Sequence, residues 1–343
     1  MEAKEQDHQA KASALIEEFR TSFDQVILTV HMLLPHEMAG KASNVNSAVR
    51  EIVDQLSGET MLTILDADAE VCETYISELD PISNMRDIYA APILFEQNFS
   101  STPMLVCVND YIWSSMAIQN MNALNKIGFP MSAYSLSVNL VQRVGFWDTH
   151  PDAIGEDMHM FIKVRGYGFF LQLSIVLCDV KFNPSALSPS HLQAYIKTKA
   201  ECRLQFVPAP IMMGHVEGNS YLGTIWARVL QAERHMRGMA DTAYVLKFMW
   251  TLGPFRGVQL LLQMLEAHLL PFLVINTMVF FPMYYMNFHR VEKHEKTNHF
   301  ELILIESACQ LTIVMSLVVL TCYEVIRYVS CKHMFNHKVV SFK

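Results

Sequence analysis

The chain has 343 residues, of which 51% are hydrophobic and 17% charged, and its formal net charge is -8. This length provides for one large domain of about 200 to 250 residues and a further region, and the apolar excess, which collects after about residue 244, is atypical of an ordinary soluble enzyme. The acidic balance and the lack of a Lys/Arg-rich tract exclude nucleic acid as the main partner, because binding a phosphate backbone requires clustered positive charge.

The first two thirds of the chain predict alternating helices and short strands. A helix is indicated by the apolar stripe of residues 14–19, and a β-branched run at 25–30 predicts a strand after it. Residues 43–55 have helical apolar spacing, and residues 60–65 form an apolar strand that stops at Asp66. Further strands are predicted at 105–108 and 171–179. The alternation indicates an α/β sheet covered by helices on both faces.

Seven cysteines occur singly along the chain, without Cys-x-x-Cys spacing. An odd, scattered set of this kind predicts reduced thiols and therefore a domain that faces the cytosol. Nearly all of these cysteines are expected to serve as small buried hydrophobic residues.

Lys41 follows Gly40 in a loop that enters the predicted helix at 43–55. An anion at such a place meets backbone N–H groups and a positive side chain. A phosphate-binding P-loop is excluded, because Gly-x-x-x-x-Gly-Lys is absent. A surface lysine at a helix start explains Lys41 equally well, and Asn44 and Asn46 are explained by capping or solvation of that helix.

Asp66 and Asp68 come directly after the strand at 60–65. Ligands of α/β sheets bind at the carboxyl ends of strands, and two carboxylates one residue apart bind a hard divalent cation there. Mg²⁺ or Mn²⁺ would bridge to phosphate oxygens of a substrate. The same Asp-x-Asp pattern is also a turn signal.

Glu156 and Asp157 precede the apolar run 158–162 and thus stand at the start of a predicted helix. Acidic residues stabilise a helix N-terminus, which is one explanation for the pair. A general base that accepts a proton from a sugar hydroxyl is the other. Gln231 and Arg234 lie on an amphipathic helix, where Arg234 suits a pyrophosphate because guanidinium meets phosphate oxygens in pairs. A solvated helix face is the alternative for these two.

Two apolar stretches near the end of the chain have the length of membrane spans. Residues 269–288 carry no charge, and residues 302–323 carry only Glu306. About 20 apolar residues cross a bilayer core, whereas buried helices of a soluble domain are the alternative. Residues 244–266 are apolar but interrupted by charges and by Gly253-Pro254, which favours helices in the membrane interface over a third crossing. The loop charges favour both ends in the cytosol.

The motifs together resemble those of the membrane-bound family-2 glycosyltransferases, the group of cellulose, chitin and hyaluronan synthases. The resemblance runs from about residue 20 to the C-terminus and is strongest to uncharacterised fungal members. That family carries Gly-Lys-x-x-x-x-Asn, Asp-x-Asp, Thr/Gly-Glu-Asp and Gln-x-x-Arg-Trp on a GT-A fold. The counterparts here are, in that order, Gly40-Lys41 with Asn46, Asp66 with Asp68, Glu156-Asp157, and Gln231 with Arg234.

The resemblance implies a GT-A-like mixed sheet with helices on both faces, followed by interfacial and transmembrane helices. It implies a catalytic domain at 1–240, interfacial helices at 241–267 and a membrane region at 268–343. The activity would be inverting transfer of a sugar from a nucleotide-sugar donor, most simply a UDP-sugar, to a glycan or lipid acceptor. The protein would sit in the Golgi, endoplasmic reticulum or plasma membrane, with membrane lipid as a further partner and its catalytic domain facing the cytosol.

The resemblance also assigns roles to single residues. Asp66 and Asp68 would handle the nucleotide and a Mg²⁺ or Mn²⁺ ion, and Asp157, with Glu156 beside it, would be the catalytic base. Lys41, Asn46, Gln231 and Arg234 would complete the donor site. His159 and His235 are candidates for acceptor contacts by position alone.

Two features depart from the family pattern. His235 stands where processive members have Trp, which weakens a polymerase interpretation. The strand and early aspartate with which the family's nucleotide site begins are expected before residues 14–19, and no matching residues are present. A catalytically inactive membrane scaffold or partner subunit is therefore the alternative function.

Overall fold

The computed structural model describes residues 7–79, 87–120, 129–150, 153, 155–164, 204–237 and 240–248, with separate helical positions between 257 and 329. Its strands form two small sheets. They are β1 (Met61–Ile64), β2 (Ile88–Ala90), β3 (Ile93–Phe95), β4 (Tyr134–Ser137), β5 (Leu204–Phe206) and β6 (Ile211–Met213). The larger sheet has the order β1-β4-β2-β5, and β3 pairs with β6 in the smaller one.

The larger sheet is mixed. Strand β4 runs antiparallel to both of its neighbours, with Met61 opposite Ser137 on one side and Tyr89 opposite Ser135 on the other. Strands β2 and β5 are parallel, as are β3 and β6. A mixed α/β sheet is therefore confirmed.

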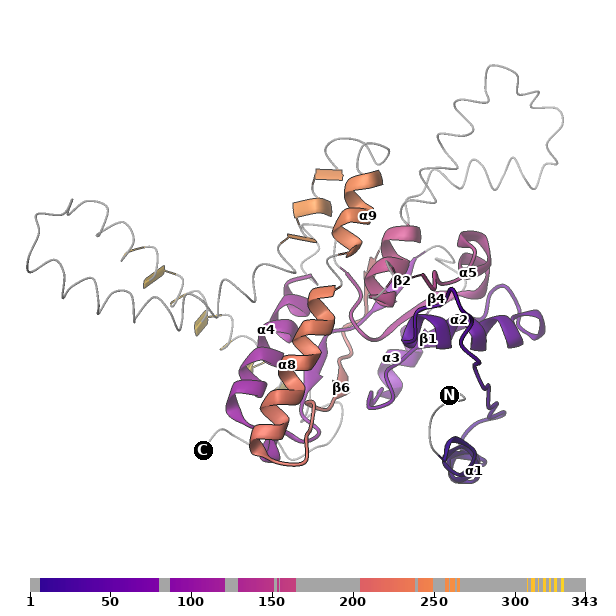
Figure 1. The fold of residues 1–343 in the computed structure, drawn as a ribbon, viewed down its shortest axis with the longest axis horizontal. Helices are drawn as coiled ribbons and strands as arrows, with labels where there is room; N and C mark the ends of the chain where they lie inside the picture. Colours follow the sequence, from indigo (N-terminus) through magenta and orange to yellow (C-terminus); the bar gives the residue numbers. More distant parts are fainter. Residues whose placement is uncertain are drawn as a thin grey trace, which may run out of the picture.

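Helices surround these sheets (Figure 1). They are α1 (His8–Phe19), α2 (Lys41–Ile52), α3 (Glu73–Ser77), α4 (Met104–Asn120), α5 (Val138–Val144), α8 (Tyr221–Arg237) and α9 (Ala240–Phe248), with 3-10 turns η1 (Val53–Gln55) and η2 (Phe99–Ser101). Residues 156–164 are also helical. Figure 1 shows α4 and α8 side by side on one flank and α2 and α5 on the other.

The buried hydrophobic side chains form two clusters, and alternate residues of a strand belong to different clusters. Ile88 and Ala90 of β2 belong to one cluster, whereas Tyr89 between them belongs to the other. Successive side chains of a strand point to opposite faces, so the clusters lie on the two faces of the sheet. Residues of α2, α5 and the helix at 156–164 pack into the first cluster, and Tyr75 of α3 packs into the second. Helices on both faces are thus confirmed.

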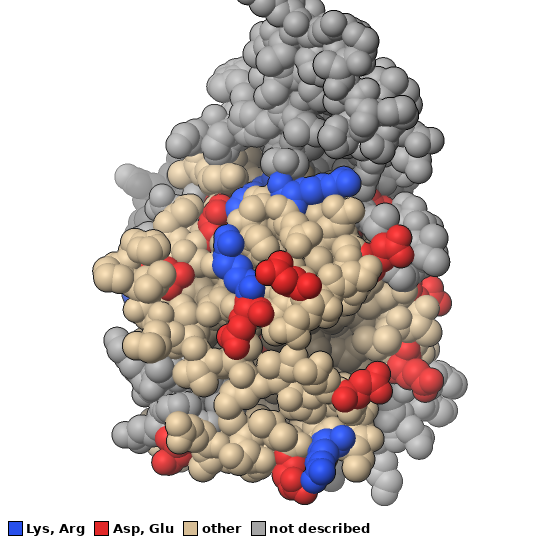
Figure 2. Space-filling model, turned by 90° about the vertical axis from the view of Figure 1, so that its right-hand side faces the viewer, with Lys and Arg blue, Asp and Glu red and all other residues tan. Residues whose placement is uncertain are grey.

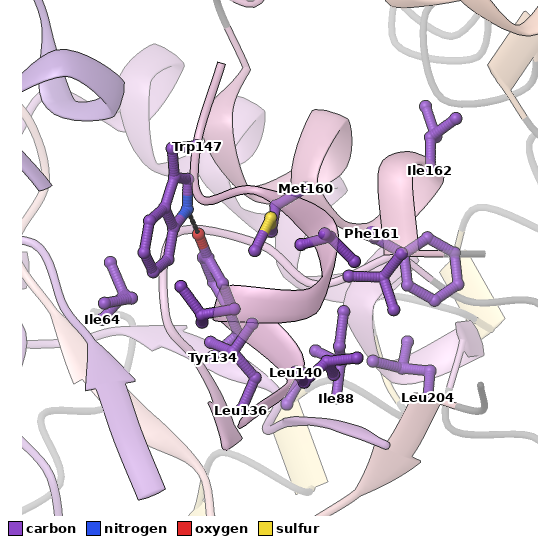
Figure 3. Close-up of a cluster of buried hydrophobic side chains, with 14 of the residues drawn as sticks. Ile64, Ile88, Tyr134, Leu136, Leu140, Trp147, Met160, Phe161, Ile162 and Leu204 are labelled. Atoms are coloured by element: carbon purple, nitrogen blue, oxygen red, sulfur yellow. Dashed lines mark hydrogen bonds between the residues drawn. The ribbon is translucent and has the colours of Figure 1, made fainter. Parts of the chain in front are cut away.

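The first cluster contains a buried polar contact (Figure 3). Trp147 donates its indole N–H to the Tyr134 hydroxyl oxygen over 2.7 Å, and the two residues are 3% and 0% exposed. Pairing both groups avoids the free energy of burying a polar atom without a partner. The contact fixes the loop after α5 against β4.

The helix predicted at 43–55 and the strand predicted at 60–65 are confirmed by α2 with η1 and by β1. The strand predicted at 105–108 is wrong, because these residues lie in α4. The Pro103 carbonyl accepts the first helical hydrogen bonds, from Val106 and Cys107, and a short apolar run does not distinguish strand from buried helix.

The strand predicted at 25–30 is also wrong. These residues form no strand, and Ile27, Leu28 and Val30 are exposed. The strand predicted at 171–179 lies outside the described residues. Cys72 and Cys107 are free and buried, as expected of small hydrophobic residues.

No helix among the described residues is long and apolar enough to cross a membrane. The predicted span at 269–288 lies outside these residues, and the one at 302–323 is described only at separate helical positions. Within the predicted interfacial segment, Val245 of α9 and the helical residues Leu260 and Met264 are buried in the first cluster. Leu246, Val258 and Leu262 are exposed.

We predict that Tyr134→Phe lowers the free energy of unfolding by about 1 to 3 kcal/mol, because the Trp147 N–H would stay buried without an acceptor. Urea unfolding followed by tryptophan fluorescence measures the change. Tyr221→Phe is the matched control, since Tyr221 is 63% exposed. Equal effects of the two substitutions would show that the buried contact contributes nothing.

Candidate active site

Lys41 joins three segments that are far apart in the sequence. It is the first residue of α2, and its Nζ lies 2.7 Å from Asp66 Oδ1 and 2.9 Å from Glu156 Oε1. Nζ also donates to the backbone carbonyl of Ser132. The ammonium is half-buried, so these ion pairs are less screened than surface pairs. The structure thus brings together Lys41, the first aspartate after β1 and the acidic pair.

Asp157 is held from the same side by backbone N–H groups. Its Oδ2 accepts a hydrogen bond from the Ser132 N–H over 2.6 Å, and its Oδ1 accepts one from the Met158 N–H over 2.7 Å. Ser132 therefore contacts Lys41 through its carbonyl and Asp157 through its N–H. Its φ of 52° places it in the left-handed region, which non-glycine residues rarely adopt.

The carboxyl groups of this site have altered proton affinities. Burial raises the pKa of Glu156 to about 8, and the charges of Asp157 and Asp66 add to the rise, whereas Lys41 opposes it. Burial also raises the pKa of Asp157. Lys41 and the N–H groups of Ser132 and Met158 lower it, but the effect of burial is larger. Burial by itself lowers the pKa of Lys41, but Glu156 and Asp66 outweigh it, so that pKa is raised. Three carboxyl groups around one ammonium leave a site that favours added positive charge or a proton.

Asp68 lies on the other side of the Asp-x-Asp turn and is exposed. Gly214 lies close to it. A Cβ added to Gly214 would be 3.6 Å from Asp68 Oδ2 and 3.5 Å from Gln97 Oε1. The missing side chain of Gly214 therefore leaves space between a carboxylate and an amide oxygen. The chemistry of such oxygen donors fits Mg²⁺ or Mn²⁺.

Gln231 belongs to a separate buried network on α8. Its Oε1 accepts a hydrogen bond from Arg228, whose Nη2 lies 2.6 Å from Asp110 Oδ1 on α4. Asp110 Oδ2 lies 2.6 Å from His215 Nδ1. All three of these partners are nearly inaccessible to solvent. The network fixes the register of α8 on α4.

The remaining predicted site residues form no hydrogen bond or ion pair with Lys41 in the described part of the chain. Asn46 accepts a hydrogen bond from Arg50 Nε on the same helix, over 3.1 Å. Arg234 is exposed on α8. His235 beside it meets the Trp113 ring edge to face, with 5.3 Å between centroids. An aromatic ring therefore lies next to the position at which the family pattern has Trp.

Both ring nitrogens of His159 contact carboxylates of the protein. It is 2% exposed, with Nδ1 2.7 Å from Asp241 Oδ1 and Nε2 3.0 Å from Asp148 Oδ2. Burial alone lowers its pKa, but the two carboxylates outweigh that effect and raise the pKa of His159 to about 9. Both ring nitrogens are engaged, which leaves none for an acceptor sugar.

Sequence reasoning missed Ser132, Gln97 and the network of Asp110, His215 and Arg228. Ser132 contributes only backbone atoms, so its identity carries no signal. Asp110 lies on α4, and the incorrect prediction of a strand at 105–108 gave no helix on which to place it. Arg228 did carry a signal, because it lies three residues before Gln231 on one helix face.

Charge on the exposed surface is mixed. On the face in Figure 2, blue Lys and Arg side chains stand next to red Asp and Glu side chains and form no extended basic surface.

The chain matches a model of a known protein family. A family model described as Glycosyl transferase family group 2 matches residues 61–323, which include β1, the acidic pair and α8. No curated protein and no solved structure matches the chain.

We predict that Glu156→Gln flattens the pH dependence of stability. A carboxyl group whose folded pKa is raised binds its proton more tightly in the folded state, so its contribution is lost as pH rises from about 4.5 to about 8. The free energy of unfolding of the parent protein should therefore fall over this window by up to a few kcal/mol from this group, and the variant should lack that part. Urea unfolding at pH 5, 7 and 9 measures it.

The control is Glu51→Gln on the exposed side of α2. It should leave the pH profile of the parent protein unchanged. An identical decline in the Glu156→Gln variant and the parent would mean that Glu156 does not hold its proton near neutral pH.

Proposed function

Because the matched region is more than half of the chain, the protein belongs to glycosyl transferase family group 2, and we propose that it moves a sugar from a nucleotide-sugar donor to a glycan or lipid acceptor with inversion. The supporting observation is the cluster of Lys41, Asp66, Glu156 and Asp157. These residues come from α2, the end of β1 and the start of the helix at 156–164, and they meet within hydrogen-bonding distance of one another or of Ser132.

Asp157 is the proposed general base. The N–H groups of Ser132 and Met158 hold both carboxylate oxygens, and each oxygen retains a lone pair for a further proton. Burial raises its pKa, which makes it a better proton acceptor than an exposed aspartate. Asp157 would accept the proton of the acceptor hydroxyl as the hydroxyl oxygen attacks the anomeric carbon and the nucleoside diphosphate departs.

Glu156 and Lys41 set the charge of the site. The raised pKa of Glu156 favours a proton on this residue, and a protonated Glu156 would repel the donor's phosphates less than a carboxylate would. Lys41 then keeps one close carboxylate, Asp66, and offers positive charge toward the diphosphate. Arg234 on α8 is proposed as a second cation for the same group, and Gln231 and Asn46 as further polar contacts of the donor.

Asp68, with Asp66 nearby, is proposed to hold Mg²⁺ or Mn²⁺. When bound, such an ion supplies positive charge to the leaving diphosphate. Asp66 is already paired with Lys41, and Asp68 and Gln97 are the oxygen donors beside the position where Gly214 has no side chain. The chemistry of both donors suits a hard cation.

The membrane assignments are part of the proposal. We propose that residues 268–343 anchor the protein, that residues 241–267 lie at the membrane interface and that residues 1–240 form a GT-A-like domain facing the cytosol. The support is the uncharged stretch 269–288 in the sequence and the exposed apolar side chains of Leu246, Val258 and Leu262. A UDP-sugar is the proposed donor. On the basis of the four sequence motifs, we also propose that the protein is similar to the polysaccharide synthases of this family.

We predict that Asp157→Asn strongly lowers the rate of sugar transfer while keeping donor binding. Loss of a general base typically lowers the rate by about 10²- to 10⁴-fold, and the amide keeps the size of the side chain. Purified full-length protein would be titrated with a panel of nucleoside diphosphates and their sugars in Mn²⁺, and turnover would be followed as release of nucleoside diphosphate. Asp54→Asn, on the exposed turn after α2, is the matched control.

Asp68→Ala separates the metal from the base. It should remove the Mn²⁺-dependent part of donor binding and leave binding in chelator unchanged. Folded protein that binds no donor would contradict the enzyme proposal and leave the inactive scaffold as the function.

A further inference from the structure

A second group of metal-binding side chains lies away from Asp68. Asp148, His150 and His159 each offer one ligand atom, and these atoms lie within 4.8 Å of one another, the only such group found among the described residues. Asp148 Oδ2 is 3.0 Å from His159 Nε2 and 4.0 Å from His150 Nε2. The three side chains come from the loop after α5 and from the helix at 156–164.

Two further contacts already orient these groups as they are oriented in metal sites. His159 Nδ1 faces Asp241 Oδ1 at 2.7 Å, and the Asp241 carboxylate is 1% exposed. Metal-ligating histidines almost always donate their other ring N–H to such a partner. On the other side, Lys163 holds Asp148 Oδ1 at 2.6 Å and the Phe146 carbonyl at 2.9 Å, which leaves Oδ2 for a ligand.

We propose that Asp148, His150 and His159 bind a Zn²⁺ ion through Oδ2, Nε2 and Nε2. Zinc bonds of about 2.0 to 2.1 Å in a tetrahedron separate the ligand atoms by about 3.3 to 3.4 Å. The observed 3.0 and 4.0 Å lie on either side of that value, and the third separation, between the two histidines, is at most 4.8 Å, so binding would draw His150 inward. Two nitrogen ligands favour zinc over Mg²⁺, which takes oxygen ligands.

The three ligands differ in exposure, and the His150 side of the group is open to solvent. His159 is buried at 2% and Asp148 is half-buried at 26%, whereas His150 is exposed at 48%. His150 can therefore close over an ion that arrives from solvent, with water as the fourth ligand. Zinc would take the place of the proton between His159 Nε2 and Asp148 Oδ2, and that proton would leave to solvent.

Bound zinc would join three parts of the chain at one point. The loop at 146–150 and the helix that begins with Glu156 and Asp157 would share the ion, and α9 would follow through Asp241. The site is separate from the Mg²⁺ or Mn²⁺ site proposed at Asp68 and does not depend on the proposed glycosyl transfer.

The test uses metal-stripped full-length protein. Zn²⁺ would be titrated against a chromophoric chelator, and Co²⁺ would be added separately to record the visible absorption of a tetrahedral site. We expect one Zn²⁺ ion to bind tightly per protein molecule. His150→Ala should weaken zinc binding by at least about tenfold, and Asp241→Asn by about 10- to 100-fold through loss of orientation.

The controls keep the outcomes apart. His36→Ala removes an exposed histidine, and Asp68→Ala removes the proposed site for the other metal; neither should change zinc affinity. His150 is exposed, so its loss should not unfold the protein, and circular dichroism would check this. Absence of a tight equivalent, or an equivalent that His150→Ala leaves unchanged, would overturn the site and leave His159 as a histidine held between two carboxylates.

Discussion

The Lys41 ammonium is the interaction on which the arrangement of the site depends. Without it, Asp66, Glu156 and Asp157 would bring three carboxyl groups into one half-buried space. Loss of the ammonium would leave these carboxyl groups without a compensating charge, which is unfavourable where solvent is partly excluded. Since Lys41 opens α2 and Asp66 ends β1, the same pairs fix the helix against the sheet.

A second ionic cluster supports the opposite side of the acidic helix. His159 lies two residues after Asp157 and reaches Asp148 and Asp241. The Asp241 carboxylate also approaches Gly155, where an added Cβ would lie only 3.2 Å from Oδ2. A side chain at 155 would press on that carboxylate, so glycine before the acidic pair has a packing reason. Helix α9 is thereby coupled to the position of the proposed base.

Much of this organisation is readable in the sequence, and the failures have physical causes. Helix α2 and strand β1 were predictable because their apolar residues follow clear periods and Asp66 ends the strand. The run at 105–108 was misread, because four apolar residues suit either structure and only Pro103 marked the helix start. Strands β2, β3, β5 and β6 have three residues each, too few to show alternation. The convergence of Lys41 and Glu156 needs tertiary structure, since 115 positions separate them.

The link between Lys41 and Asp157 runs through the peptide groups of Ser132 and not through its side chain. Any residue that accepts the left-handed conformation preserves both contacts, so the chemical identity of position 132 is free to drift. Glycine adopts that conformation without strain, whereas proline has no N–H and a φ fixed near -65°. The constraint at this position therefore acts on the backbone dihedral angles. A search for an invariant side chain would not detect it.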